Sequence, residues 1–136
     1  MLDAVLHSDG KYRADLAYDG AGPLQMNGLT VILQAARKLP SSIEEVLARQ
    51  GISPQQVAAF LLHQANLNLL TRVAKALGVG HEKVFANVQR YGNTSSASML
   101  IAASEWAATA TGAGPIVFSA FGAGFHWGAL VAEPAI

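Results

Sequence analysis

The chain has 136 residues, of which 51% are hydrophobic and 13% are charged, and it contains no cysteine. That length is typical of one domain, and the apolar fraction is too high for a disordered chain. Nine basic and nine acidic residues cancel, so the charge does not favour a nucleic acid or an anionic membrane as partner. The lack of cysteine excludes disulfides, thiolate metal sites and a cysteine nucleophile within this chain.

The N-terminus carries an aspartate and no basic cluster, so it does not resemble a secretory signal. The longest apolar run, residues 57–62, is much shorter than the ~20 residues that a transmembrane helix needs. We therefore expect a single cytoplasmic domain, residues 1–136, with no membrane partner. No histidine has metal-ligand spacing to a partner, so no metal site is predicted.

The chain begins with two predicted short strands. Residues 2–7 are typical of a strand, which ends at the turn signal Ser8-Asp9-Gly10. Residues 14–18 are typical of a second short strand. Residues 19–23 are rich in Gly and end in Pro, which indicates a loop.

A helix with one apolar face is predicted to begin at Asn27. Pro40 lacks a backbone N–H, so we expect the helix to be interrupted there. Ser41 and Glu44 have the spacing of a capping box, which predicts a restart at Ser41 and an end at Gly51.

The middle of the chain predicts a cap, a buried strand and a helix. Ser53-Pro54 is typical of an N-cap followed by proline at the first helical position. Residues 58–62 form a continuous apolar run that suits a strand buried on both faces. Residues 66–77 predict a helix that Asn66 caps and Gly78 ends.

The last third predicts a short strand at residues 84–86 and a small-residue helix over 94–111 that ends at Gly112. Two strands, residues 116–121 and 127–132, follow with a glycine-rich turn between them. Because strands and helices alternate along the whole chain, we predict an α/β fold with a sheet covered on both sides.

His63-Gln64-Ala65-Asn66 follows the predicted buried strand directly. In open α/β sheets ligands bind outside the carboxyl ends of the strands, which is where His63 is predicted to lie. A neutral imidazole donates a hydrogen bond from one nitrogen and accepts at the other. The structural alternative is a histidine that only hydrogen-bonds the strand end, and this tetrapeptide alone favours neither interpretation.

Gly92-Asn93-Thr94-Ser95-Ser96-Ala97-Ser98 leads from a turn into a helix, and its small side chains let backbone or ligand approach closely. The Asn93 amide offers two hydrogen-bond donors. Asn, Thr and Ser are also the usual N-cap residues, so the stretch taken alone favours a capping cluster. A cap does not need four consecutive small polar residues, which keeps a functional role open.

A glycine-rich stretch, residues 121–128, separates the last two predicted strands. Gly122 and Gly124 permit backbone angles closed to other residues and let the Ala123 amide approach a ligand. Taken alone, a tight hairpin turn is the favoured interpretation. The remaining histidines are assigned to structure or surface: His7, His81 and His126.

In their order and spacing, the His-Gln-Ala-Asn, Gly-Asn-Thr-Ser and glycine-rich Phe-His-Trp-Gly stretches together resemble the C-terminal half of β-ketoacyl-acyl-carrier-protein synthase III, of the thiolase superfamily. The stretch Leu6-His7-Ser8-Asp9-Gly10 resembles the segment that leads into that half, so the resemblance covers essentially the whole chain. It implies the C-terminal half of a thiolase-like fold, a mixed sheet covered by helices, and a homo-oligomer.

The resemblance also implies a decarboxylating condensation of an acyl group from coenzyme A with malonyl-acyl-carrier protein. No cofactor is expected to be bound, because the coenzyme A thioester and the phosphopantetheine arm are substrates. His63, neutral and protonated on its donor nitrogen, and the Asn93 amide would stabilise the malonyl thioester oxygen. The Ala123 backbone N–H, at a position where the family usually has glycine, would contribute to a second oxyanion hole.

Further positions are carried over from the family in the same way. Asn66 and Gly28 match positions that contact pantetheine. Asn68 stands where the family often has an arginine that meets the acidic carrier protein. Arg72 and Lys75, on the same predicted helix, are the candidates to replace it in carrier docking.

Two functions from different classes stay open, because the chain has the histidine and asparagine of such a site but no cysteine. The first is the catalytic half of an acyltransferase, inactive alone and completed by a missing N-terminal half. The second is a non-catalytic binding or assembly subunit that pairs with a separate cysteine-bearing partner. A plain α/β domain, whose motifs are only caps and turns, is the structural alternative.

Overall fold

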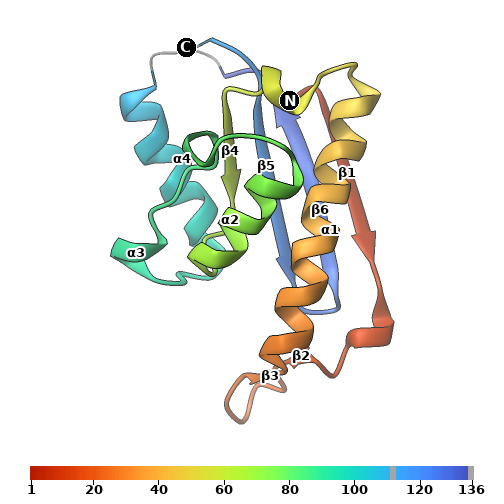
Figure 1. Ribbon diagram of the computed structural model, residues 1–136. Coiled ribbons are helices and arrows are strands. Elements are labelled where there is room, and N and C mark those ends of the chain that lie inside the picture. Colours follow the sequence, from red (N-terminus) through yellow and green to blue (C-terminus); the bar gives the residue numbers. More distant parts are fainter. Residues whose placement is uncertain (111–112, 135–136) are drawn as a thin grey trace.

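A four-stranded mixed sheet runs through the computed structural model, which describes residues 1–110 and 113–134 (Figure 1). The strand order is β1-β6-β5-β4; β4 and β5 are parallel, and the other neighbouring pairs are antiparallel. The strands are β1 (Asp3–Ser8), β4 (Ala59–Leu62), β5 (Ile116–Gly122) and β6 (His126–Ala132).

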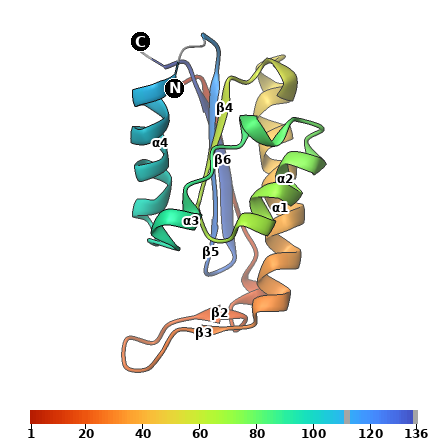
Figure 2. The same ribbon diagram turned by 60° about the vertical axis from the view of Figure 1, so that its left-hand side comes forward.

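Helices cover both faces of this sheet, as Figure 2 shows. On one face lie α1 (Gly28–Arg49) and α2 (Leu67–Ala76), and on the other lies α4 (Ala97–Thr109). The predicted α/β class and the covered sheet are therefore confirmed. The short elements are β2 (Leu16–Ala17), β3 (Gln25–Met26), α3 (Val88–Tyr91) and three 3₁₀ turns at Gly10–Tyr12, Pro54–Gln56 and His81–Lys83.

Strand β4 divides the core into two parts. Successive side chains of a strand face opposite sides of a sheet, and all four residues of β4 are buried. Phe60 and Leu62 belong to the large apolar cluster that includes α1 and α2 residues, whereas Ala59 and Leu61 belong to a second cluster with Trp106 of α4. The apolar run of β4 is continuous because a helical layer covers the strand on each side, so every side chain of the strand is buried.

The predicted break at Pro40 is wrong, because α1 is one continuous helix of 22 residues that contains the proline. Proline inside a helix removes one hydrogen bond and costs about 3 kcal/mol. On either side of Pro40, the buried residues Leu39, Ile43 and Val46 pack against the sheet. Burial of one such side chain stabilises by about 1.5–3 kcal/mol, so the three together outweigh the lost bond.

The capping box predicted at Ser41 and Glu44 is therefore also wrong. The predicted start of the helix is confirmed to within one residue: Asn27 is the N-cap of α1, and its side-chain oxygen accepts a hydrogen bond from the Thr30 N–H at 3.3 Å. Its C-terminal end agrees with the prediction, since Gly51 has a φ of +64° just beyond the last turn.

The segment between α2 and α4 also differs from the prediction. Residues 84–86 form no strand, and only Val84 makes an isolated bridge to Phe60, because 3₁₀ and helical turns on either side leave no room for a ladder. The helix predicted from Thr94 begins at Ala97, since Ser95 has a φ of +54° and cannot be helical. The end predicted at Gly112 lies outside the described residues.

The other predicted strands and the helix from Asn66 are confirmed to within a few residues as β1, β2, β4, β5, β6 and α2. No helix among the described residues is long and apolar enough to cross a membrane. Within residues 1–110 and 113–134, no group of three or more His, Cys, Asp or Glu side chains could hold a metal ion.

Candidate active site

The parallel strands β4 and β5 bring two of the predicted site segments to one edge of the sheet (Figure 1). His63 follows β4 directly, and its backbone N–H donates to the Ser119 carbonyl of β5 at 2.9 Å. Strand β5 then continues to Gly122, after which Ala123 begins the turn into β6. His63 and Ala123 therefore both lie at the carboxyl edge, where ligands bind in open α/β sheets.

The start of α4 holds the imidazole of His63. Its Nδ1 lies 2.6 Å from the Oγ of Ser98, which is in the first turn of α4. The same oxygen accepts a hydrogen bond from the Gln64 backbone N–H at 3.1 Å. Burial lowers the pKa of His63 below its ordinary value of 6.5, because the charged ring would be partly removed from water. The ring is accordingly neutral at pH 7.

Gln64 has a role that its sequence context does not indicate. Its side chain is 1% exposed, and its amide NH₂ donates to the carbonyls of Leu62 at 2.9 Å and Phe85 at 3.0 Å. Its Oε1 accepts from the Asn87 backbone N–H at 3.0 Å. These bonds join the end of β4 to the segment before α3. A buried glutamine has no local signal, since its partners come from a later part of the chain.

Asn93 lies in the turn between α3 and α4 and is exposed. Its Oδ1 accepts a hydrogen bond from the Ser95 backbone N–H at 2.9 Å, so its NH₂ group faces away from that bond. The residue at the N-cap of α4 is Ser96, which makes no side-chain capping bond. The capping interpretation favoured from this stretch alone therefore does not account for Asn93.

Ala123 is exposed in a turn that Phe125 anchors. The Phe125 N–H and carbonyl pair with the carbonyl and N–H of Asp9 at 2.9 and 2.8 Å, and its buried ring stacks on Tyr12 at a centroid distance of 5.2 Å. Gly124 has a φ of +135°, a region that L side chains rarely adopt. Ala123 itself has no positive φ, so its side chain is compatible with the turn.

The other predicted contacts lie on different elements. Asn66 caps α2, since its Oδ1 accepts from the N–H groups of Asn68 at 2.8 Å and Leu69 at 3.3 Å. Arg72 and Lys75 are exposed on the same helix, one turn apart. Gly28 begins α1, with open space around the position of a β-carbon.

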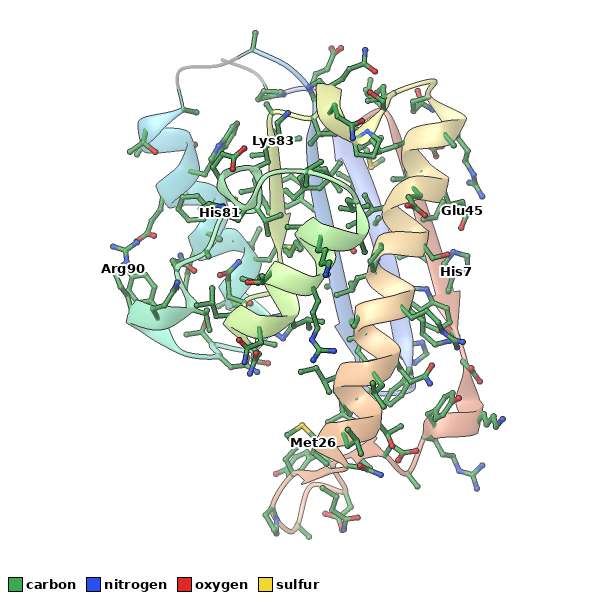
Figure 3. The ribbon with its side chains drawn as sticks, in the orientation of Figure 1. His7, Met26, Glu45, His81, Lys83 and Arg90 are labelled. Carbon is green, nitrogen blue, oxygen red and sulfur yellow. The ribbon has the colours of Figure 1, made fainter. Side chains whose placement is uncertain are left out.

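Gly28 lies two residues after Met26, the last residue of β3, which Figure 3 labels. Among the three remaining histidines, His126 lies opposite Gly122 at the same edge of the sheet as Ala123. His7 lies near the carboxyl end of β1. Figure 3 shows His7 beside Glu45, with its Nε2 2.8 Å from a carboxylate oxygen. His81 is exposed, and the Nδ1 of His126 lies 2.7 Å from the Ser8 hydroxyl.

A mixed sheet between helical layers, with a histidine at its carboxyl edge beside a glycine-rich turn, defines the C-terminal half of a thiolase-like fold. Residues 47–133 match the family model 3-oxoacyl-[acyl-carrier-protein (ACP)] synthase III C terminal. The chain belongs to this family.

Relatives of known name agree with this assignment. The β-ketoacyl-[acyl-carrier-protein] synthase III of Rhodobacter capsulatus is 40% identical over 142 residues, covering 96% of this chain and 43% of the relative. The synthase III of Gloeobacter violaceus is 42% identical over 124 residues, covering 88% of this chain and 38% of the relative. The crystal structure of the synthase III from Aquifex aeolicus superposes on this chain with a TM-score of 0.92 at 32% sequence identity. The match covers 98% of this chain and 44% of the Aquifex chain. The chain thus spans less than half the length of these relatives.

Proposed function

We propose that this chain is the C-terminal catalytic half of a 3-oxoacyl-acyl-carrier-protein synthase III-like acyltransferase, which condenses an acyl-CoA with malonyl-acyl-carrier protein. The observation that carries the proposal is the neutral imidazole of His63, held by Ser98 at the carboxyl edge of the sheet. A neutral ring donates a hydrogen bond without holding a full positive charge. That property suits an oxygen on which negative charge develops during a reaction.

The reaction needs such donors in its first half. When the malonyl thioester loses carbon dioxide, the electrons of the broken C–C bond move to the thioester oxygen and form an enolate. In the proposal, His63 and the NH₂ group of Asn93 donate to that oxygen. The orientation of the Asn93 amide supports this role, because Ser95 occupies its oxygen end. Each fixed donor of this kind stabilises a transition state by about 3 kcal/mol.

The second half of the reaction needs an acyl group carried on a cysteine, and this chain contains no cysteine. The enolate attacks an acyl group held as a thioester on a cysteine; a new C–C bond forms, the C–S bond breaks, and the thiolate leaves. We assign the Ala123 backbone N–H to a second oxyanion hole, which stabilises the acyl carbonyl oxygen during this step. The exposed position of Ala123 at the same edge as His63 supports that assignment.

The composition of α4 supports a partner polypeptide that supplies the cysteine. Its 13 residues include one charged side chain, Glu105, and Leu100 is 65% exposed. A helix that is apolar around most of its circumference is normally buried. We infer that the outer face of α4 packs against the part of the relatives' length that this chain does not span. That part belongs either to the same polypeptide or to a separate subunit.

The substrate contacts expected from the family remain part of the proposal. Asn66 and Gly28 would contact the pantetheine arm, and the exposed Arg72 and Lys75 would attract an acidic carrier protein. These contacts, the homo-oligomer and the cytoplasmic location are predictions that follow from the family resemblance.

The proposal is tested by joining this chain to the N-terminal half of the Rhodobacter capsulatus relative and measuring condensation of acetyl-CoA with malonyl-carrier protein. We expect activity from the chimera and none from the 136-residue chain. His63→Ala in the chimera should reduce activity by at least 100-fold, as expected when an oxyanion donor is lost. His81→Ala, which alters an exposed histidine, is the matched control. Product formation by the isolated chain, or full activity of the His63→Ala chimera, would contradict the proposal.

A further inference from the structure

Ser98 is the buried link between α4 and the end of β4. It is 2% exposed, and its hydroxyl oxygen lies 2.6 Å from His63 Nδ1 and 3.1 Å from the Gln64 backbone nitrogen. These two partners come from adjacent residues more than thirty positions earlier in the chain. The direction in which the Ser98 hydroxyl proton points therefore determines which nitrogen of the His63 ring is protonated.

The direction of these bonds follows from donor and acceptor counting. A serine hydroxyl has one donor and two acceptor sites, and the Gln64 N–H, which can only donate, takes one acceptor site. A buried hydroxyl proton needs an acceptor of its own. Helical serines can donate to the carbonyl four residues earlier, but among the described residues Ser98 makes no such bond to Thr94. His63 Nδ1 is then the acceptor, and the ring proton resides on Nε2.

The geometry points to Ser98 as a positioning residue that holds His63 in the tautomer protonated on Nε2. The imidazole then presents a donor, rather than a lone pair, on the side opposite Ser98. The catalytic use of that donor rests on the function proposed above, whereas the tautomer is a property of this chain alone.

The same turn also orients the second donor. The Ser98 backbone N–H donates to the Ser95 carbonyl at 3.2 Å, and the Ser95 N–H donates to Asn93 Oδ1 at 2.9 Å. A continuous series of hydrogen bonds thus connects Asn93 to His63 through the start of α4. The turn thus orients the Asn93 amide through the Ser95 backbone and the His63 ring through the Ser98 hydroxyl.

The tautomer can be read directly from the ring nitrogens by ¹⁵N NMR of the 136-residue chain near pH 8. In the wild type we expect His63 Nε2 to have the chemical shift of a protonated nitrogen and Nδ1 that of an unprotonated one. In Ser98→Ala both shifts should move toward each other, as they do when two tautomers exchange. Ser98→Thr keeps the hydroxyl and should restore the wild-type pattern.

Ser8→Ala is the matched control, because it removes a hydroxyl from Nδ1 of a different histidine, His126. It should leave the His63 shifts unchanged. The inference is overturned if wild-type His63 carries its proton on Nδ1, or if a folded Ser98→Ala protein keeps the wild-type shifts. If Ser98→Ala does not fold, the His63 shifts of the wild type and of Ser98→Thr still test the inference, because both must show the ring protonated on Nε2.

The activity of the chimera separates this inference from the proposed function. An inactive chimera in which His63 is protonated on Nε2 would refute the proposed function and leave the role of Ser98 intact. In an active chimera, Ser98→Ala should lower kcat more than it raises KM for malonyl-carrier protein, because the donor acts mainly on the charge of the transition state. A lowered kcat with unchanged His63 shifts would contradict the positioning role.

Discussion

Asp9 and Phe125 are joined by two reciprocal backbone hydrogen bonds, at 2.8 and 2.9 Å, although they lie near opposite ends of the chain. Asp9 follows β1, and Phe125 ends the turn that contains Ala123. The segment after β1 thus holds the glycine-rich turn from its buried side. Because Phe125 is fully buried and tilts against Phe121 at a centroid distance of 4.7 Å, the turn has a fixed anchor and Ala123 remains exposed.

Phe125→Ala should lower the free energy of unfolding by about 3–5 kcal/mol, as is typical when a buried aromatic ring is removed. Urea denaturation followed by circular dichroism measures this change. Leu29→Ala removes an exposed apolar side chain and is expected to change stability by less than ~0.5 kcal/mol. Equal destabilisation by the two variants would show that the turn is not anchored by Phe125.

Gln64→Ala should destabilise the chain by about 2–4 kcal/mol, because it leaves the buried Leu62 carbonyl, the half-buried Phe85 carbonyl and the buried Asn87 N–H without partners. The measurement is again urea denaturation. Gln55→Ala is the control, since Gln55 is exposed and makes one long hydrogen bond to the Gly78 carbonyl. A loss for Gln64→Ala no greater than that of the control would argue against its bridging role.

His63 should titrate below the ordinary histidine pKa, because burial disfavours the protonated ring. The unfolded chain then binds a proton at a higher pH than the folded one does. The stability linked to His63 is complete above the unfolded pKa and is lost as pH falls through the folded pKa. NMR titration of the ring protons, with the chain in urea as the reference, measures both values. A folded His63 that titrates at or above the unfolded value would contradict the prediction.

Glu105 should make stability depend on pH in the acid range. The Tyr91 hydroxyl, the Asn87 amide and Arg90 all lower the pKa of this carboxyl group, with the Tyr91 hydrogen bond as the largest cause. Because the folded pKa lies below the unfolded one, the linked stability is present above the unfolded pKa and is lost as pH falls through the folded pKa.

Glu105→Gln should therefore lower the urea midpoint at pH 7 and have a smaller effect at pH 3, because the linked stability decreases as the pH falls below the unfolded pKa toward the folded one. Glu44→Gln, on the exposed side of α1, is the control and should leave the midpoint unchanged at both pH values. An effect of Glu105→Gln that is the same at pH 7 and pH 3 would exclude the charged carboxylate as its cause.

Leu100→Arg should leave the isolated chain folded, since Leu100 is mostly exposed. In the chimera with an N-terminal half it should reduce condensation and thermal stability, because the charge would be buried at the proposed contact of α4. Circular dichroism and the condensation assay measure the two effects. Leu29→Arg, at another exposed leucine, is the control. A fully active and stable Leu100→Arg chimera would show that α4 is not covered there.

Local signals predicted much of the fold. The cap at Asn66, the glycines after α1 and α2 and the apolar run before His63 are contained within a few neighbouring residues, and each was found where the pattern placed it. Pro40 was misjudged because a local rule about proline omits the apolar residues that pack α1 onto the sheet. The start of α4 was misjudged because the left-handed backbone of Ser95 is set by the turn around Asn93.

By itself the sequence determined the chemistry that this chain carries and the chemistry that it lacks. Its ordered motifs provide a histidine, an asparagine and a glycine-rich turn, and it has no cysteine. Only the tertiary structure decided how those groups are held. The contact between His63 and Ser98 joins residues 35 positions apart. Such a contact exists only once β4 packs against α4, because no local pattern specifies which distant hydroxyl will meet the imidazole.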